Sequence, residues 1–196
     1  CREGAVSGRR SMLAAGNRSR SDPPTHHPQK EHLVNNETTT VAPEIAASRA
    51  AWVAWLRGDD TAADRRLIPA LLHTESRDAL MVYPHRGSWD HTDPTRGRTW
   101  SLSEDELSAL WCNGAPDETL SNRIIDGLDK ILDRDTNTDS EHAVALAVQG
   151  FLAWDAENVT TASLWVSQSL QHDPNLRLAR LVDAALSRGI LPYWRK

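Results

Sequence analysis

Apolar side chains recur at helical spacing through the last quarter of the chain, which predicts three amphipathic helices over residues 141–154, 158–171 and 175–188. Residues three and four apart lie on one side of a helix, so a regular apolar stripe predicts a face buried against a neighbour. The stripes of the second and third helices are Ala162, Trp165, Val166 and Leu170, and Leu178, Leu181, Val182 and Ala185. Because the connecting turns are short, we expect the three helices to stack.

Small residues predict close packing between these helices. Gly150 and Ala162 would let the first two backbones approach, while Asp173 and Pro174 end one helical hairpin and start the next helix. This pattern resembles a single tetratricopeptide repeat, and a weaker echo of the same residue order lies between residues 54 and 71. We therefore predict an all-α fold of stacked helical hairpins, tetratricopeptide-like, in a single domain over residues 42–196.

Helix signals also precede this region. Pro43 suits the first turn of a helix that Gly58 stops. A helix that starts near Asp60 meets Pro69, whose ring and missing N–H break it, so residues 70–82 are predicted to form a separate helix.

Two more helices are predicted after a polar loop over residues 84–98. Ser103 and Glu106 make a capping box for a short helix that ends at Trp111, and Pro116 opens the next helix. The apolar stripe of that next helix consists of Leu120, Ile124, Leu128, Ile131 and Leu132. We interpret both helices as packing elements.

The first 41 residues differ in composition from the rest, being rich in Ser, Arg, Asn, Thr, Pro and His and poor in large apolar groups. Such a segment cannot bury enough surface to offset the entropy of ordering, so we predict a disordered polar and basic arm over residues 1–41. The whole chain nevertheless has a net charge of −5, so the remainder is acidic. Nucleic acid is therefore not the expected main partner, although weak contact through the arm is an alternative.

Membrane and redox signals are weak. No apolar run approaches the ~20 residues that a membrane helix needs. Cys1 and Cys112 are the only cysteines, too few for a disulfide framework. We therefore expect a cytoplasmic protein without a membrane partner. Because the chain starts with Cys1 and not with Met, we expect a fragment or a processed product, with a lipid-anchored terminal cysteine as the alternative.

The C-terminal helices carry a family resemblance. Its residues are Gly150, Phe151, Leu152, Ala153 and Trp154, Asn158 to Ala162, Ser169, Leu170, Asp173 and Pro174, and Leu178, Ala179, Leu181, Leu186, Gly189, Ile190 and Pro192. They resemble the end of the actinobacterial domain-of-unknown-function family 4192, in which an LAW helix, an A…AL..DP helix and an LA.LL…L..G.P helix follow in this order. Ser76 to Leu80 also resemble its VRDAL segment. The resemblance implies fold and lineage, and it assigns no catalytic residue.

The polar loop over residues 84–98 holds the densest cluster of chemically active side chains. The cluster is His85, Arg86, Asp90, His91, Asp93, Arg96 and Arg98, between Trp89 and Trp100. His85, His91 and Asp93 are candidate metal ligands or an acid/base pair, but their spacing matches no established helical ligand motif. The alternative is an exposed loop that its tryptophans hold against the domain.

Oxygen-bearing side chains alternate at Asp133, Asp135, Asn137 and Asp139, as in the first half of a calcium-binding loop. Thr138 stands where that loop needs glycine, and Val144 stands where a bidentate Glu should close the site. We therefore expect a solvated acidic linker with a helix cap at Asp139 or Ser140, and no bound ion.

No nucleophile with a neighbouring base is visible, so the sequence favours a non-enzymatic helical binding or scaffold module without a cofactor. A protein or peptide is the expected partner. Eight tryptophans are many for this length and aromatic anchors concentrate at interfaces, so the candidate contact residues are Trp52, Trp89, Trp100 and Trp111. The alternatives are a metal-dependent or acid/base enzyme using residues 85–98, and a nucleic-acid-associated protein acting through its arm.

Overall fold

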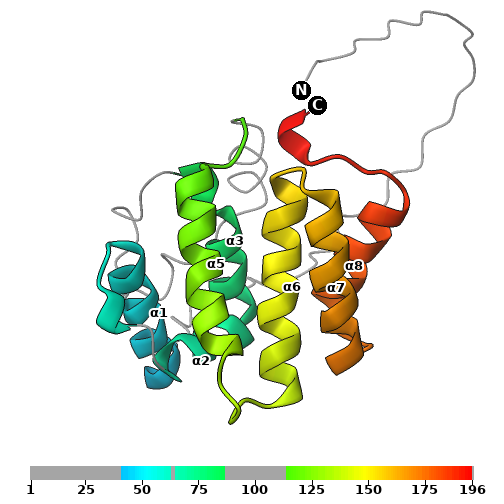
Figure 1. The fold of residues 1–196 in the computed structure, drawn as a ribbon. Helices are drawn as coiled ribbons and strands as arrows, with labels where there is room; N and C mark the ends of the chain where they lie inside the picture. Colours follow the sequence, from blue (N-terminus) through cyan, green and yellow to red (C-terminus); the bar gives the residue numbers. More distant parts are fainter. Residues whose placement is uncertain (1–40, 63–64, 87–113, 196) are drawn as a thin grey trace, which may run out of the picture. The chain divides into compact units, whose positions relative to one another are not determined.

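A computed structural model of the chain describes residues 41–62, 65–86 and 114–195. These ranges contain helices and turns and no strand, which confirms the all-α prediction for the described residues (Figure 1). The helices are α1 (Pro43–Leu56), α2 (Ile68–Leu72), α3 (Thr74–Arg86), α5 (Glu118–Leu132), α6 (Asp139–Asp155), α7 (Val159–His172) and α8 (Arg177–Ser187). Residues 1–40 of the predicted arm and the predicted capping-box helix that ends at Trp111 lie outside the described residues.

Helix α6 is the centre of the domain. It packs against α5 and α7, its neighbours in the sequence, and also against α2, α3 and α8. All residues from 143 to 153 are buried, so α6 is covered on every side. Successive helices α5, α6 and α7 run in alternating directions, and α8 packs on both α6 and α7 (Figure 1). The α6–α7 pair is the predicted hairpin, while its tetratricopeptide-like character stays a prediction.

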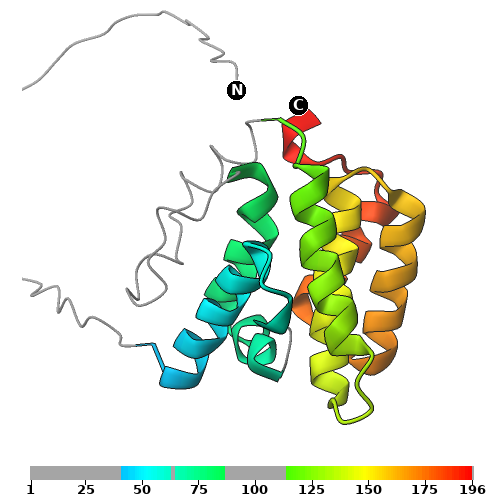
Figure 2. The same ribbon diagram turned by 60° about the vertical axis from the view of Figure 1, so that its left-hand side comes forward.

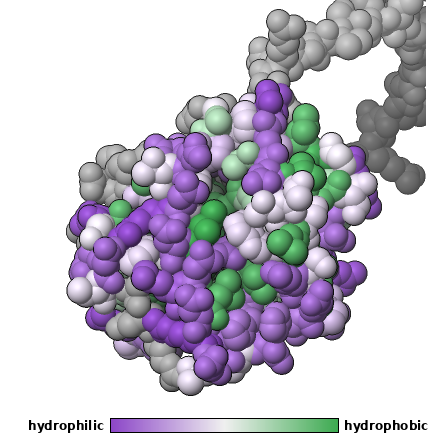
Figure 3. Space-filling view, viewed as in Figure 1, coloured by the Kyte–Doolittle hydropathy of each residue, from purple (hydrophilic) through white to green (hydrophobic). Residues whose placement is uncertain are grey.

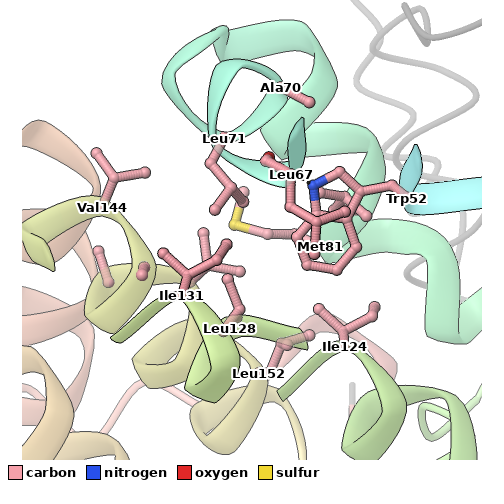
Figure 4. Close-up of a cluster of buried hydrophobic side chains, with 14 of the residues drawn as sticks. Trp52, Leu67, Ala70, Leu71, Met81, Ile124, Leu128, Ile131, Val144 and Leu152 are labelled. Carbon is pink, nitrogen blue, oxygen red and sulfur yellow. Dashed lines mark hydrogen bonds between the residues drawn. The ribbon is translucent and has the colours of Figure 1, made fainter. Parts of the chain in front are cut away.

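One hydrophobic core joins α1, α2, α3, α5 and α6 (Figure 4). The stripe of α5 faces this core, where Ile124, Leu128 and Ile131 have no exposed surface. Met81 of α3 and Leu152 of α6 contribute side chains from the other elements. Removing this apolar surface from water is the main stabilising term of the fold.

Helix α1 meets α5 at a glycine. A Cβ atom added to Gly127 would lie 2.8 Å from Nε1 of Trp55 and 2.9 Å from Cζ3 of Trp52. Both indoles are fixed, because Nε1 of Trp52 donates to the Leu67 carbonyl at 2.9 Å and Nε1 of Trp55 donates to the Arg123 carbonyl at 2.7 Å. Glycine is therefore the residue that lets α5 rest on the two tryptophans.

The predicted close approach of α6 and α7 is confirmed. A Cβ atom on Gly150 would lie 2.6 Å from Cγ2 of Val166 and 3.5 Å from the carbonyl oxygen of Ala162. Ala162 and Val166 are both buried, so small side chains set the distance between these helices.

A buried arginine connects α1 to α3. Arg49 has no exposed surface, and its Nε donates to Oγ of Ser76 at 2.7 Å. Oγ of Ser76 also lies 3.0 Å from Nδ1 of His73, at the junction of α2 and α3. Burial lowers the pKa of Arg49, while the carboxylate of Glu75, 4.0 Å away, acts in the opposite direction.

Helix boundaries before residue 87 differ from the predicted ones. The helix predicted over residues 70–82 is interrupted at His73, whose backbone is extended, so α2 ends at Leu72 and α3 begins at Thr74. Helix α3 then continues through Pro84, which was predicted to start a loop, to Arg86. The echo between residues 54 and 71 does not form a second hairpin, because α1 is followed by short 3-10 turns over Asp60–Ala62 and Arg65–Leu67.

Two predicted caps are also corrected. The N-cap of α6 is Thr138, not Asp139 or Ser140, since Oγ1 of Thr138 accepts from the Glu141 N–H and the Glu141 carboxylate accepts from the Thr138 N–H. This reciprocal pair is a capping box. Asp173 and Pro174 do not cap the next helix, since α8 begins at Arg177, after the predicted start at Asn175, and its N-cap is Leu176.

Candidate binding groove

A hollow of about 720 Å³ lies between α3 and α8, with the end of α6 as its floor. Phe151 and Trp154 of α6 lie at this floor, with Met81 and Val82 on the α3 side. The wall from α8 and the following segment is formed by Leu178, Leu181, Val182, Ala185 and Ile190. Volumes of this size are typical of ligand sites, and the lining is mostly apolar. We call this hollow the α3/α8 groove.

The rim of the groove exposes apolar side chains. Leu181 is 58% exposed and Tyr193 is 56% exposed, while the neighbouring Val182 is buried. The sequence placed Leu181 on the buried face of its helix, and this prediction is wrong: α8 turns Val182 to the core and Leu181 to the groove. The opposite view of the domain, over α5, α6 and α7, is mainly hydrophilic with scattered hydrophobic side chains (Figure 3).

Arg77 and Asp78 form the polar end of the groove on α3. Nη2 of Arg77 lies 3.4 Å from Oδ1 of Asp78, which is long for a charge-assisted hydrogen bond. Nε of Arg77 is buried and has no hydrogen-bond partner among the described residues. Burial raises the pKa of Asp78, and the neighbouring Arg77 offsets part of this rise.

Two further arginines extend the polar rim on α8. Arg177 lines the groove and also a smaller adjoining hollow of about 330 Å³, whose other lining residues are Asn175, Arg180 and Leu181. Arg177 and Arg180 are both exposed. The groove therefore has a basic edge on a chain whose net charge is −5.

His85, the one predicted metal or acid/base candidate of the polar loop that the structure describes, lies in α3 and contacts α6. Its Nε2 is 2.6 Å from Oδ2 of Asp155, and its Nδ1 is 3.1 Å from the carbonyl oxygen of Gly114. The side chains of His85 and Asp155 are 1% and 2% exposed. Asp155 also lines the groove, and its carbonyl accepts from Nε1 of Trp194 at 3.0 Å.

The number of protons that His85 and Asp155 carry limits the chemistry of this pair. A neutral imidazole has one N–H, yet both nitrogens of His85 face oxygen acceptors. The two contacts are both hydrogen bonds only if the ring carries two protons or the Asp155 carboxyl carries one. In either state no ring nitrogen is left to accept a proton from a substrate. The geometry therefore fits a connection between the end of α3 and the end of α6 better than a general base.

The other predicted metal ligands are not brought together by the part of the chain that the structure describes. His91 and Asp93 lie outside the described residues. In the acidic linker, Nδ2 of Asn137 donates to the Ile131 carbonyl, and the Asp139 carboxylate lies 3.0 Å from Nδ1 of His172. No group of three or more His, Cys, Asp or Glu that could hold a metal ion occurs in the described ranges.

Of the predicted contact tryptophans, only Trp52 is described, and it has no exposed surface because it lies in the core. Trp89, Trp100 and Trp111 lie outside the described residues. The tryptophan that does line the groove is Trp154, whose Nε1 donates to the Ile190 carbonyl at 3.0 Å. The signal in the sequence that could have indicated this role is the position of Trp154 at the end of a predicted helix, next to a turn.

No protein-family model matches the chain, and no curated protein or solved structure does. The resemblance to family 4192 therefore stays a prediction. Within the described residues, no helix combines the length and the apolar character needed to cross a membrane. The predicted cytoplasmic location stays a prediction as well.

Proposed function

We propose that this chain is a non-enzymatic helical binding module, which holds an apolar segment of a protein partner in the α3/α8 groove. The observation that carries the proposal is the groove itself, with an apolar floor and with Leu181 and Tyr193 exposed at its rim. Covering such side chains with a partner removes apolar surface from water, which favours association. A helix or extended peptide in a groove is a common mode of recognition by helical domains.

The state of His85 favours this function over the enzymatic alternative. Both ring nitrogens contact oxygen atoms, so this histidine lacks the free nitrogen that acid/base chemistry needs. The second alternative, nucleic-acid contact through the arm over residues 1–41, has no described residue that favours it.

The experiment is peptide selection on the purified full chain. A phage-displayed library of random 12-residue peptides is selected on the wild type, on Leu181→Glu and on Leu164→Glu. Leu164 is 56% exposed on α7 and lies outside the groove lining, so it matches Leu181 in exposure and chemistry. Circular dichroism checks that each variant remains folded.

We expect the wild type and Leu164→Glu to enrich the same peptides, with large apolar residues over-represented. Leu181→Glu places a carboxylate in the apolar wall and should enrich none of them. The proposal is overturned if the wild type enriches no more peptides than Leu181→Glu does, or if Leu164→Glu loses binding to the same extent.

A further inference from the structure

We propose that the partner segment is acidic, with a side-chain carboxylate that pairs with Arg77 beside the apolar residues that fill the groove. This inference rests on the proposed function and specifies the chemistry of its ligand. It starts from Arg77, whose side chain is only 15% exposed. A guanidinium offers five N–H donors in a planar fork, and a carboxylate matches two of them at once.

The described contacts leave Arg77 short of acceptors. Its Nε is buried without a hydrogen-bond partner in the described part of the chain, and its contact to Asp78 is 3.4 Å long. A buried donor without an acceptor is unfavourable, so a carboxylate brought by a ligand would gain more here than at an exposed arginine.

Charged side chains of both signs line the groove, but not all of them are available to a ligand. They are Arg77 and Arg177, and Asp78 and Asp155. Asp155 is occupied by His85 at 2.6 Å, whereas Asp78 lies beside Arg77, with 3.4 Å between Oδ1 and Nη2. Arg180 adds another positive charge in the adjoining hollow. A cationic segment would therefore meet repulsion, and an anionic one attraction.

The extent of this surface points to a peptide. The groove and the second hollow share Arg177 and Leu181 in their linings, so apolar and basic side chains line two adjoining hollows. A peptide offers several apolar side chains and acidic groups at fixed intervals. A free fatty acid carries the same two chemical groups and is the competing outcome of the test.

The test uses the same displayed library on the wild type, on Arg77→Gln and on Arg188→Gln. Arg188 follows α8, is exposed and does not line the groove, so Arg188→Gln removes one positive charge elsewhere. We expect wild type and Arg188→Gln to enrich peptides in which Asp or Glu accompanies the large apolar residues. Arg77→Gln should keep the apolar enrichment and return the acidic content to that of the unselected library.

One enriched peptide is then used to measure the coupling energy between its acidic side chain and Arg77. Replacing its Glu by Gln should weaken binding to the wild type by about tenfold or more, and should change binding to Arg77→Gln by less than about twofold. Calorimetry measures the four affinities. Equal losses in both proteins would overturn the pairing with Arg77.

The outcomes separate the two proposals. Apolar peptides without acidic enrichment on the wild type would overturn the acidic inference and leave the binding function standing. No enrichment at all would overturn both. Sodium dodecanoate is titrated in parallel, with 1-dodecanol as control. If dodecanoate binds in an Arg77-dependent way and no peptide is enriched, the ligand is a lipid-like carboxylate and the peptide proposal is wrong.

Discussion

Helices α1–α3 lie on one side of the domain and helices α5–α8 on the other (Figure 2). They share one core but differ in the interactions that hold them together. In the first group, directional hydrogen bonds from buried side chains fix the packing: Trp52 donates to a backbone carbonyl and Arg49 donates to Ser76. In the second group, Gly150 and Ala162 let long helices touch. The second group also has a buried hydrogen bond, from Oγ of Ser169 on α7 to the Ala143 carbonyl of α6 at 2.7 Å, so what distinguishes it is the close helix approach at Gly150.

The largest effect should come from Arg49 in the first group. In Arg49→Met the apolar chain is retained, but Oγ of Ser76 loses the hydrogen bond from Nε of Arg49 and keeps only its contact with Nδ1 of His73. We expect the free energy of unfolding to fall by about 2–3 kcal/mol, because a buried hydrogen bond is lost and methionine does not fill the space of the guanidinium. Urea denaturation measures it, with the exposed Arg188→Gln as control. Equal stabilities would show that the buried guanidinium contributes no more than packing.

A smaller effect is expected at Gly150 in the second group. In Gly150→Ala the new Cβ meets Cγ2 of Val166, and the crowding should cost about 1–2 kcal/mol despite the better helix propensity of alanine. Val166→Ala removes the obstructing methyl group. The loss in the double variant should therefore be smaller than the sum of the two single losses by about 1 kcal/mol. Additive losses would mean that α7 moves away instead of clashing.

The smallest effect concerns Asp78, on the α3 side of the groove between the two groups. Its pKa is raised by burial, so the folded state retains a proton that the unfolded chain has already lost. Ionised Asp78 therefore destabilises the fold above its raised pKa, and this cost disappears as the pH falls below the ordinary aspartate value of about 4. Because the side chain is 42% exposed, solvent screening limits the effect to about a few tenths of a kcal/mol.

Asp78→Asn should accordingly be slightly more stable than the wild type at pH 7, and the difference should vanish near pH 3. Thermal unfolding at several pH values measures it. A difference of the opposite sign at pH 7 would show that the charge pair with Arg77 outweighs the burial.

The two groups also differ in how well their sequence predicts them. The stripes of α5 and α7 predicted the helices and their buried faces, because regular periodicity over four turns or more leaves little ambiguity. Helix α6 was predicted to be amphipathic, and this is wrong, since residues 143–153 are all buried. Before residue 87, the pattern did not predict the short helices, the break at His73 or the continuation of α3 through Pro84. In this part of the chain, tertiary contacts and not local sequence preferences decide where each helix begins and ends.

The site was harder to predict than the fold. His85 and Asp155 lie 70 positions apart, so no spacing rule could pair them. No sequence pattern marks Arg49 as buried, because Ser76, which accepts its hydrogen bond, lies 27 positions away. Leu181 fitted the apolar stripe of its helix as well as Val182 did, and the two are distinguished only by how α8 packs on α6 and α7.

Gly127 gives a means of recognising distant relatives of this chain. Two indoles fixed by their own hydrogen bonds cannot retreat from a side chain on α5, so Trp52, Trp55 and Gly127 constrain one another. In a homologue with little overall identity, these three positions should change together or not at all. Their joint occurrence is a signature that can be searched for where ordinary sequence similarity has faded.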